Sequence, residues 1–345
     1  MSVEHRTHSG HGLRADASPS PATAVRMMLG VVIGLTVVVV VMLCAFALPS
    51  VKGGPHNVPI GVAGPQQAVQ AIQSRLDGDA WDVTAYPDPE AIQNAIKRRD
   101  IVGGLALGPN GVTVYTASAA GQQISAALSA LGTGMAAQQQ LRATVQDVVP
   151  FPADDPRGAG FTASLLPMIF GGIVPAVALL RLFPGRANLR FQLTGAILFA
   201  LVAGFSVGAV LQYGFGSLSG SYWLTALALS LGMAALSIPL LALESLFGMG
   251  GLATGAIVMF LVGNPLSGIA GPYWLPTGWA VFGQLLPPGA TAGLVRAISF
   301  FDGTGAGGPA ITLAVWALAG LLLMLVPGRR SAGAPQQAAS TASPA

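Results

Sequence analysis

Six apolar stretches without a charged side chain constrain the fold of this chain more than any other feature. They cover residues 27–48, 162–180, 191–213, 222–243, 245–263 and 309–326. A helix needs about 20 apolar residues to cross a hydrocarbon core about 30 Å thick, and all six stretches qualify, the last near the lower limit. The sequence therefore predicts a polytopic, mainly α-helical membrane protein with six transmembrane helices.

The composition also indicates a membrane protein. Only 8% of the residues are charged and 52% are hydrophobic, whereas soluble chains carry about 25% charged residues. A cleaved signal peptide is the alternative for the first stretch, because small residues flank Phe46 as they do at a cleavage site. The apolar region of a signal peptide is shorter, about 7–15 residues, so we favour an uncleaved helix within residues 26–49.

Positively charged residues set the expected orientation, since those in short connections stay on the cytoplasmic side of a membrane. They precede the first stretch, fill the connection 181–190 and follow the last stretch, as Arg6, Arg14, Arg26, Arg181, Arg186, Arg190, Arg329 and Arg330. Six crossings place all of them on one side, with both termini in the cytoplasm and segment 50–160 outside the cell. The end segments 1–25 and 328–345 are poor in large apolar residues, and we expect disordered cytoplasmic tails.

Residues 50–160 are expected to form a small extracytoplasmic α/β domain. Apolar runs predict strands at 57–64, 81–86, 101–107 and 112–117. Helical periodicity predicts helices at 65–76 and 88–99, the second beginning with Asp88 and Pro89 at the cap and first turn. A long, weakly amphipathic helix over 121–148 is predicted to lead back to a five-helix membrane domain at 161–327.

Catalytic chemistry is sparse in this sequence. No Asp, Glu, Lys, Arg or His lies in the six stretches, and segment 50–160 pairs no nucleophile with a base. The P-loop pattern GxxxxGK[ST] is absent, and the glycine string Gly303, Gly305 and Gly308 lies in an outer connection rather than after a strand. We therefore expect no enzyme activity, cofactor, metal site or nucleic-acid partner. Glu244, at the end of the fourth stretch, is either a partner contact or a solvated helix terminus.

The segment 264–301 departs from the pattern of spanning helices. Prolines interrupt it, and Tyr273, Trp274 and Trp279 suit a membrane interface. Residues 277–286 are too short to span a bilayer, so we expect a re-entrant or interfacial helix on the outer side, with a second helix from 290 to 301. The candidate residues of this re-entrant segment are Pro265, Trp279, Gln284, Pro287 and Pro288.

This layout resembles that of type 2 ABC-transporter (ABC-2) permeases, and more narrowly that of YhgE/Pip-like bacterial membrane proteins. One helix precedes an outer α/β domain that opens with the strand VPIGV at 58–62, and five helices follow. The sequence LPTGWAVFGQLLPPGATAGLVR at 275–296, with the turn GNP at 263–265, is similar to the outer re-entrant segment of that superfamily. The outer domain is far shorter than in the largest YhgE/Pip-like members and lacks long coiled-coil segments.

The resemblance implies a homodimer or heterodimer in the bacterial plasma membrane whose cytoplasmic surface docks a separate ATP-binding subunit. It also implies export of an amphiphile, a glycan or a drug. In such permeases the connection equivalent to 181–190 touches the ATPase. The docking candidates are therefore Arg181, Arg186 and Arg190, with Glu244 beside them at the same predicted side.

Two functions from different classes remain open. The first is the permease subunit of an ABC-type exporter that moves an amphiphilic or envelope-related substrate with energy from a separate ATPase. The second is a non-transporting cell-envelope scaffold or receptor that displays the 50–160 domain. Five helices after that domain exceed what an anchor requires, which favours the permease.

Overall fold

The computed structural model describes residues 20–51, 53–76, 78–109, 111–269, 271–276 and 278–326. Within them, five helical segments are long and apolar enough to cross a membrane: Pro21–Ala47, Ala159–Leu182, Arg186–Gly214, Tyr222–Phe247 and Gly307–Leu325. A shorter apolar helical segment covers Met249–Gly263. The prediction of a mainly helical protein with membrane-length helices is confirmed for five of the six stretches. The stretch 245–263 forms the shorter segment instead.

The chain divides into two compact units, residues 1–44 and 45–345. The described part of the first unit is a valine-rich apolar helix that belongs to α1 (Pro21–Val51). Its first turn includes residues 21–25, so the predicted disordered tail is wrong for that part, where Pro21 follows Ser20 at the start of a helix. The rest of that tail and the segment 328–345 lie outside the described residues.

A five-stranded sheet forms the polar part of the second unit. The strands lie in the order β2-β1-β3-β4-β5, and all neighbours pair in parallel except β3 and β4. Their bounds are Val58–Ala63 (β1), Trp81–Ala85 (β2), Gly103–Gly108 (β3), Gly111–Thr116 (β4) and Arg142–Asp147 (β5). The helices of this sheet domain are α2 (Gln66–Leu76), α3 (Pro89–Lys97) and α4 (Gln122–Gln138).

The predicted helix start at Asp88 is confirmed, whereas the predicted helix over 121–148 is confirmed only as far as Gln138 and is wrong beyond it. The Asp88 carboxylate accepts a hydrogen bond from the Ala91 amide at 2.7 Å, with Pro89 in the first turn. Helix α4 ends at Gln138, and Gln140 adopts a φ of 55° that turns the chain into β5. As the edge strand, β5 forms backbone hydrogen bonds with β4 along one side, a pairing that the apolar pattern alone does not reveal.

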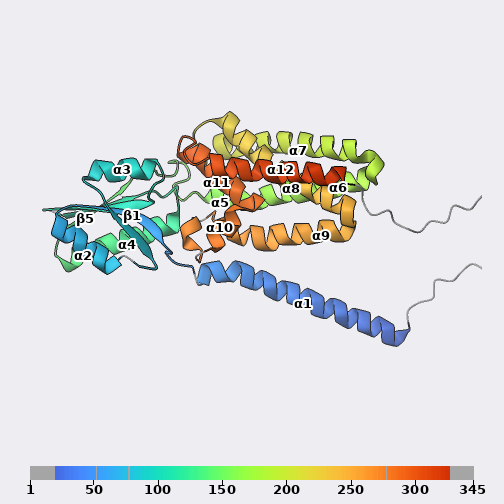
Figure 1. Cartoon of the computed structure of the whole chain (residues 1–345), viewed down its shortest axis with the longest axis horizontal. Coiled ribbons are helices and arrows are strands. Elements are labelled where there is room, and N and C mark those ends of the chain that lie inside the picture. The colour runs from blue at the N-terminus through green and yellow to red at the C-terminus, as the bar shows by residue number, and fades with distance from the viewer. Residues whose placement is uncertain are drawn as a thin grey trace, which may run out of the picture. The chain divides into compact units, whose positions relative to one another are not determined.

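The remaining helices form a bundle around α8 (Tyr222–Phe247), which packs against α6, α7, α11 and α12. Figure 1 shows the sheet domain at one end of this bundle. The other helices are α5 (Ala159–Ala163), α6 (Leu165–Leu182), α7 (Leu189–Ala209), α9 (Met249–Val258), α10 (Trp279–Gln284), α11 (Pro287–Phe300) and α12 (Gly307–Leu325). Short turns extend or join them: η1 (Arg186–Asn188), η2 (Val210–Gly214), η3 (Met259–Gly263), η4 (Pro265–Ser267) and η5 (Pro272–Trp274).

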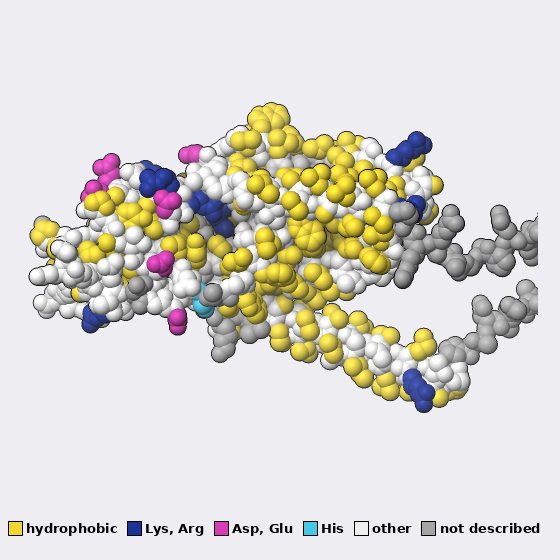
Figure 2. All heavy atoms as spheres, in the orientation of Figure 1, with side chains coloured by type: hydrophobic (Ala, Val, Ile, Leu, Met, Phe, Trp, Pro, Cys, Tyr) yellow, Lys and Arg dark blue, Asp and Glu magenta, His cyan; other side chains and the backbone are white. Residues whose placement is uncertain are grey.

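The bundle has a buried centre and an apolar outer surface. Most of α8 is buried, whereas α7 and α12 keep large hydrophobic side chains exposed, among them Phe199, Val202 and Leu322. Figure 2 shows hydrophobic side chains covering the visible face of the helices, with charged side chains gathered toward the sheet domain and the opposite end. A lipid-facing surface accounts for this arrangement, because exposed apolar side chains of this extent are unfavourable in water.

A glycine ends helix α8 and separates it from α9. Gly248 has a φ of 69°, a backbone conformation that side-chain-bearing residues rarely adopt, and the chain reverses there. Helix α8 therefore continues through Glu244 to Phe247, and α9 begins at Met249 rather than at Ser245. This reversal shortens the fifth predicted stretch below the length of the other spans.

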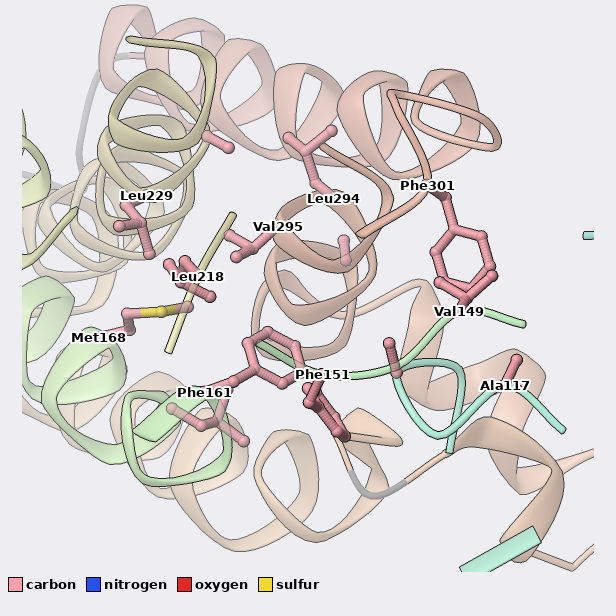
Figure 3. Close-up of a cluster of buried hydrophobic side chains, with 14 of the residues drawn as sticks. Ala117, Val149, Phe151, Phe161, Met168, Leu218, Leu229, Leu294, Val295 and Phe301 are labelled. Atoms are coloured by element: carbon pink, nitrogen blue, oxygen red, sulfur yellow. The ribbon is translucent and has the colours of Figure 1, made fainter. Parts of the chain in front are cut away.

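A continuous apolar cluster joins the sheet domain to the bundle (Figure 3). Phe300 of α11 is half-buried and packs against this cluster, with ring centroids 5.2 Å from Phe151 and 5.6 Å from Phe161, both edge-to-face. Around these rings the cluster takes residues from both parts of the unit, namely Ala117, Val149, Met168, Leu218, Leu229, Leu294, Val295 and Phe301. Burial on this scale holds the two parts together.

Close helix contact at Gly204 yields a first prediction. A Cβ atom at Gly204 of α7 would lie 2.6 Å from the backbone nitrogen of Ser230 in α8, so α7 and α8 must separate to admit it. We expect Gly204→Ala to lower stability by about 1–3 kcal/mol, measured as a reduced melting temperature in detergent. Gly250→Ala in α9, where a Cβ meets nothing within 4 Å, is the matched control and should be neutral or stabilising. Equal melting temperatures for the two variants would contradict this packing.

Candidate functional site

The three predicted docking arginines lie where α6 turns into α7, and all three are exposed. Arg181 belongs to the last turn of α6, Arg186 begins the short turn η1, and Arg190 lies in the first turn of α7. Pro184 and Gly185 make the turn possible, since Gly185 has a φ of 82°. The structure thus brings the predicted residues to one end of the bundle but gives them different surroundings.

Arg186 is bound to the ends of two other helices. One terminal nitrogen donates to the Ser245 hydroxyl at 2.9 Å, and the other donates to the carbonyls of Met324 and Val326 at 3.0 and 2.8 Å. These contacts satisfy carbonyl oxygens at the end of α12 and place a positive charge where the helix dipoles of α8 and α12 are negative. Arg186 therefore holds the C-terminal ends of α8 and α12 together.

Arg181 and Arg190 remain available to a partner. The Arg190 guanidinium lies 4.8 Å from the centroid of the Phe191 ring, which stacks on Phe183. Among the described residues neither arginine forms an ion pair. Glu244 is half-buried in the last turn of α8 and likewise pairs with no arginine in the described part of the chain. The structure places Glu244 near this end without joining it to the arginines.

The predicted re-entrant residues gather at the other end of the bundle. Pro265 starts η4, half-exposed Trp279 starts the six-residue α10, and the Gln284 side chain donates to the Ser267 carbonyl at 2.7 Å. Pro287 and Pro288 are buried in the first turn of α11, where a missing amide hydrogen costs nothing. The predicted helices at 277–286 and 290–301 correspond to α10 and α11. Their depth in a membrane stays a prediction.

Arg296 is the residue that sequence reasoning missed. Only 2% of it is exposed, within α11, and its guanidinium donates to the carbonyls of Gly268 and Ile269. The Phe161 ring lies 5.2 Å from its central carbon. Its Nε atom has no partner among the described residues. The one signal in the sequence is that Arg296 is the single charge between Glu244 and Asp302.

Arg99 connects the sheet domain to the segment that follows α11. It ends the turn after α3, donates to the Thr304 carbonyl at 3.2 Å and lies 5.0 Å from the Phe301 ring. Burial lowers the pKa of Arg99, an effect that nearby Tyr273 partly offsets. Burial, and then the charge of Arg99, lowers the pKa of Arg296 to about 9.

No cluster of three or more His, Cys, Asp or Glu side chains that would hold a metal ion occurs within the described ranges. Neither a protein-family model nor a curated protein matches this chain. The candidate functional sites are therefore the two ends of the bundle, with exposed arginines at one end and the buried Arg296 and half-buried Arg99 at the other.

The contrast between Arg186 and Arg181 yields a second prediction. Arg186→Ala removes the donors that hold the ends of α8 and α12, and we expect a loss of about 1–2 kcal/mol, seen as a lower melting temperature in detergent. Arg181→Ala removes the same charge from the same connection without breaking a hydrogen bond to another helix, and should leave the melting temperature within about 1 °C. A similar decrease in both variants would show that charge, not the carbonyl contacts, matters here.

Proposed function

We propose that this chain is the membrane-spanning permease subunit of an ABC-type exporter, driven by a separate ATPase. The observation that carries the proposal is the exposed cationic connection 181–190 at the end of a bundle with membrane-length helices. The substrate class proposed is amphiphilic or envelope-related, as the resemblance of the sequence implies. The protein then resides in the bacterial plasma membrane.

Six crossings follow if Met249–Gly263 traverses the bilayer as the fifth. It begins beside the Arg186 end of α8, and at its far end Gly263 lies against Pro288 of α11, where a Cβ would meet the proline ring at 2.9 Å. A 15-residue helix rises only about 22 Å, so the adjoining turn η4 or local bilayer thinning completes the crossing. If this segment did not span the bilayer, the chain would cross five times and its two termini would lie on opposite sides of the membrane.

The charge distribution supports a cytoplasmic position for the arginine end. Arg181, Arg186 and Arg190 lie in a short connection, and such residues remain in the cytoplasm. The sheet domain then lies outside, and both termini face the cytoplasm. An ATPase that presents acidic side chains would meet Arg181 and Arg190, while the exposed apolar faces of the bundle serve lipid or a second subunit in a homo- or heterodimer.

An envelope scaffold or receptor is the second candidate. The apolar cluster around Phe300 favours it, because this cluster fixes the sheet domain on the bundle as a rigid display would require. The two functions differ in whether an ATPase is bound.

Copurification tests the proposal and is the third prediction. Tagged full-length protein is extracted in detergent, and bound proteins are identified by mass spectrometry. We expect a P-loop ATPase with the wild type and at least about tenfold less with the Arg181→Glu, Arg190→Glu double variant, because reversed charges repel an acidic surface.

Arg142→Glu is the matched control, since Arg142 is exposed on β5 at the other end of the unit. It should recover as much ATPase as the wild type. Recovery of no ATPase by the wild type would favour the scaffold. Equal recovery by the double variant would show that the ATPase binds elsewhere.

A further inference from the structure

A cavity lies where the sheet domain meets the bundle. Its volume is about 330 Å³, at the lower end of the range of roughly 300–1,000 Å³ for small-molecule sites. Its wall comes from the first turn of α4, the linker before α5, α5 itself, the segment before η5 and helix α11. The lining residues used below are Gly121, Gln123, Ala126, Phe151, Arg157 and Arg296.

Arg296 is a buried cation without a carboxylate partner in this wall. Its terminal nitrogens are held by backbone carbonyls, and its Nε is unpartnered within the described part of the chain. A buried charge is costly unless it is paired or bound to a ligand, and carbonyls supply only partial negative charge. Arg157, exposed at the rim, adds a second positive charge to the same cavity.

The nearby carboxylate of Asp155 interacts with the charge of Arg157 but does not line the cavity. Its oxygens also accept hydrogen bonds from the amides of Ala159 and Gly160, each at 2.8 Å. No Asp or Glu is among the described residues that line the cavity. The charge of Arg296 is therefore not neutralised by a carboxylate in the described wall of the cavity.

The start of α4 adds hydrogen-bond donors to this cavity. Gly121 precedes the 17-residue helix and provides no side-chain cap. The first amides of a helix have no acceptor within it, and the helix dipole makes this end positive. A guanidinium group and an uncapped helix start that line the same cavity can together bind a phosphate group.

We propose that this cavity binds the phosphate group of a phosphorylated ligand between Arg296, Arg157 and the first amides of α4. Phe151 and Ala126 provide an apolar wall for the part of the ligand next to the phosphate. A phospholipid headgroup and a soluble phosphate ester share this chemistry. The inference does not depend on the proposed transport, because binding is measured without an ATPase.

Thermal stabilisation and titration calorimetry on the purified full chain test the site, as the fourth prediction. Inorganic phosphate should raise the melting temperature relative to chloride at equal ionic strength, because a ligand that binds the folded state stabilises it. Nanodiscs containing phosphatidic acid, compared with phosphatidylcholine alone, test the lipid source. Stabilisation by phosphate indicates that the group itself suffices, and stabilisation by phosphatidic acid alone indicates a headgroup.

Two variants make the test specific. Arg296→Gln removes the buried cation and should weaken phosphate binding by at least about tenfold, the loss expected for a charge-assisted hydrogen bond. Gln123→Glu keeps the fold, because Gln123 is exposed, and its carboxylate should repel the phosphate from the helix start to a similar extent. Gln138→Glu, at the opposite end of α4, introduces the same charge as a matched control and should bind as the wild type does.

If Arg296→Gln fails to fold, phosphate binding by Gln123→Glu still tests the site. Binding by Gln123→Glu with wild-type affinity would overturn the proposal. So would the absence of stabilisation by both phosphate and phosphatidic acid in the wild type. Equal loss of binding in Gln123→Glu and Gln138→Glu would also overturn it, because general surface charge rather than this cavity would then attract the ligand.

Discussion

The apolar contact between the sheet domain and the helical bundle is the interaction on which the rest of the structure depends. Phe300 of α11 inserts between Phe151, from the linker after β5, and Phe161 of α5. Edge-to-face rings add to the hydrophobic gain of burying them. Residues of the sheet domain and of α6, α8 and α11 belong to one buried cluster. The sheet domain is therefore packed against the bundle and not connected to it by linkers alone. Phe151 of this contact also lines the cavity, and Phe300 holds α11 against the linker.

This contact also explains how two arginines remain inside the junction without carboxylate partners. Arg296 lies against Phe161, and Arg99 lies against Phe301, so the rings that exclude water also face the guanidinium groups. Carbonyls of Gly268, Ile269 and Thr304 accept the hydrogen bonds. This compensation is partial for Arg296, whose Nε lacks a partner among the described residues. The phosphate proposal follows from that imbalance together with the uncapped start of α4.

Sequence reasoning succeeded where local patterns decide the structure. The helix start at Asp88 and the strands flanking the turn before Gly111 depend on caps, turns and alternation within a few residues. Strand β5 was missed because all its side chains are exposed, so its pairing with β4 leaves no apolar alternation. The site at Arg296 was missed for another reason. Its acceptors are backbone carbonyls 27 and 28 residues away, and a carbonyl has no signature in the sequence.

Helix α12 links the two ends of the bundle mechanically. It begins just after Thr304, which binds Arg99, and it ends at the carbonyls that bind Arg186. Midway, Gly320 approaches α8 so closely that a Cβ would lie 2.7 Å from the nitrogen of Pro239. Packed helices shift as rigid bodies rather than deform continuously. A partner that moves the Arg186 end of α12 would therefore also displace the turn that holds Arg99, next to the cavity. If the proposed ATPase binds the connection 181–190, this helix would connect its binding site to the sheet domain.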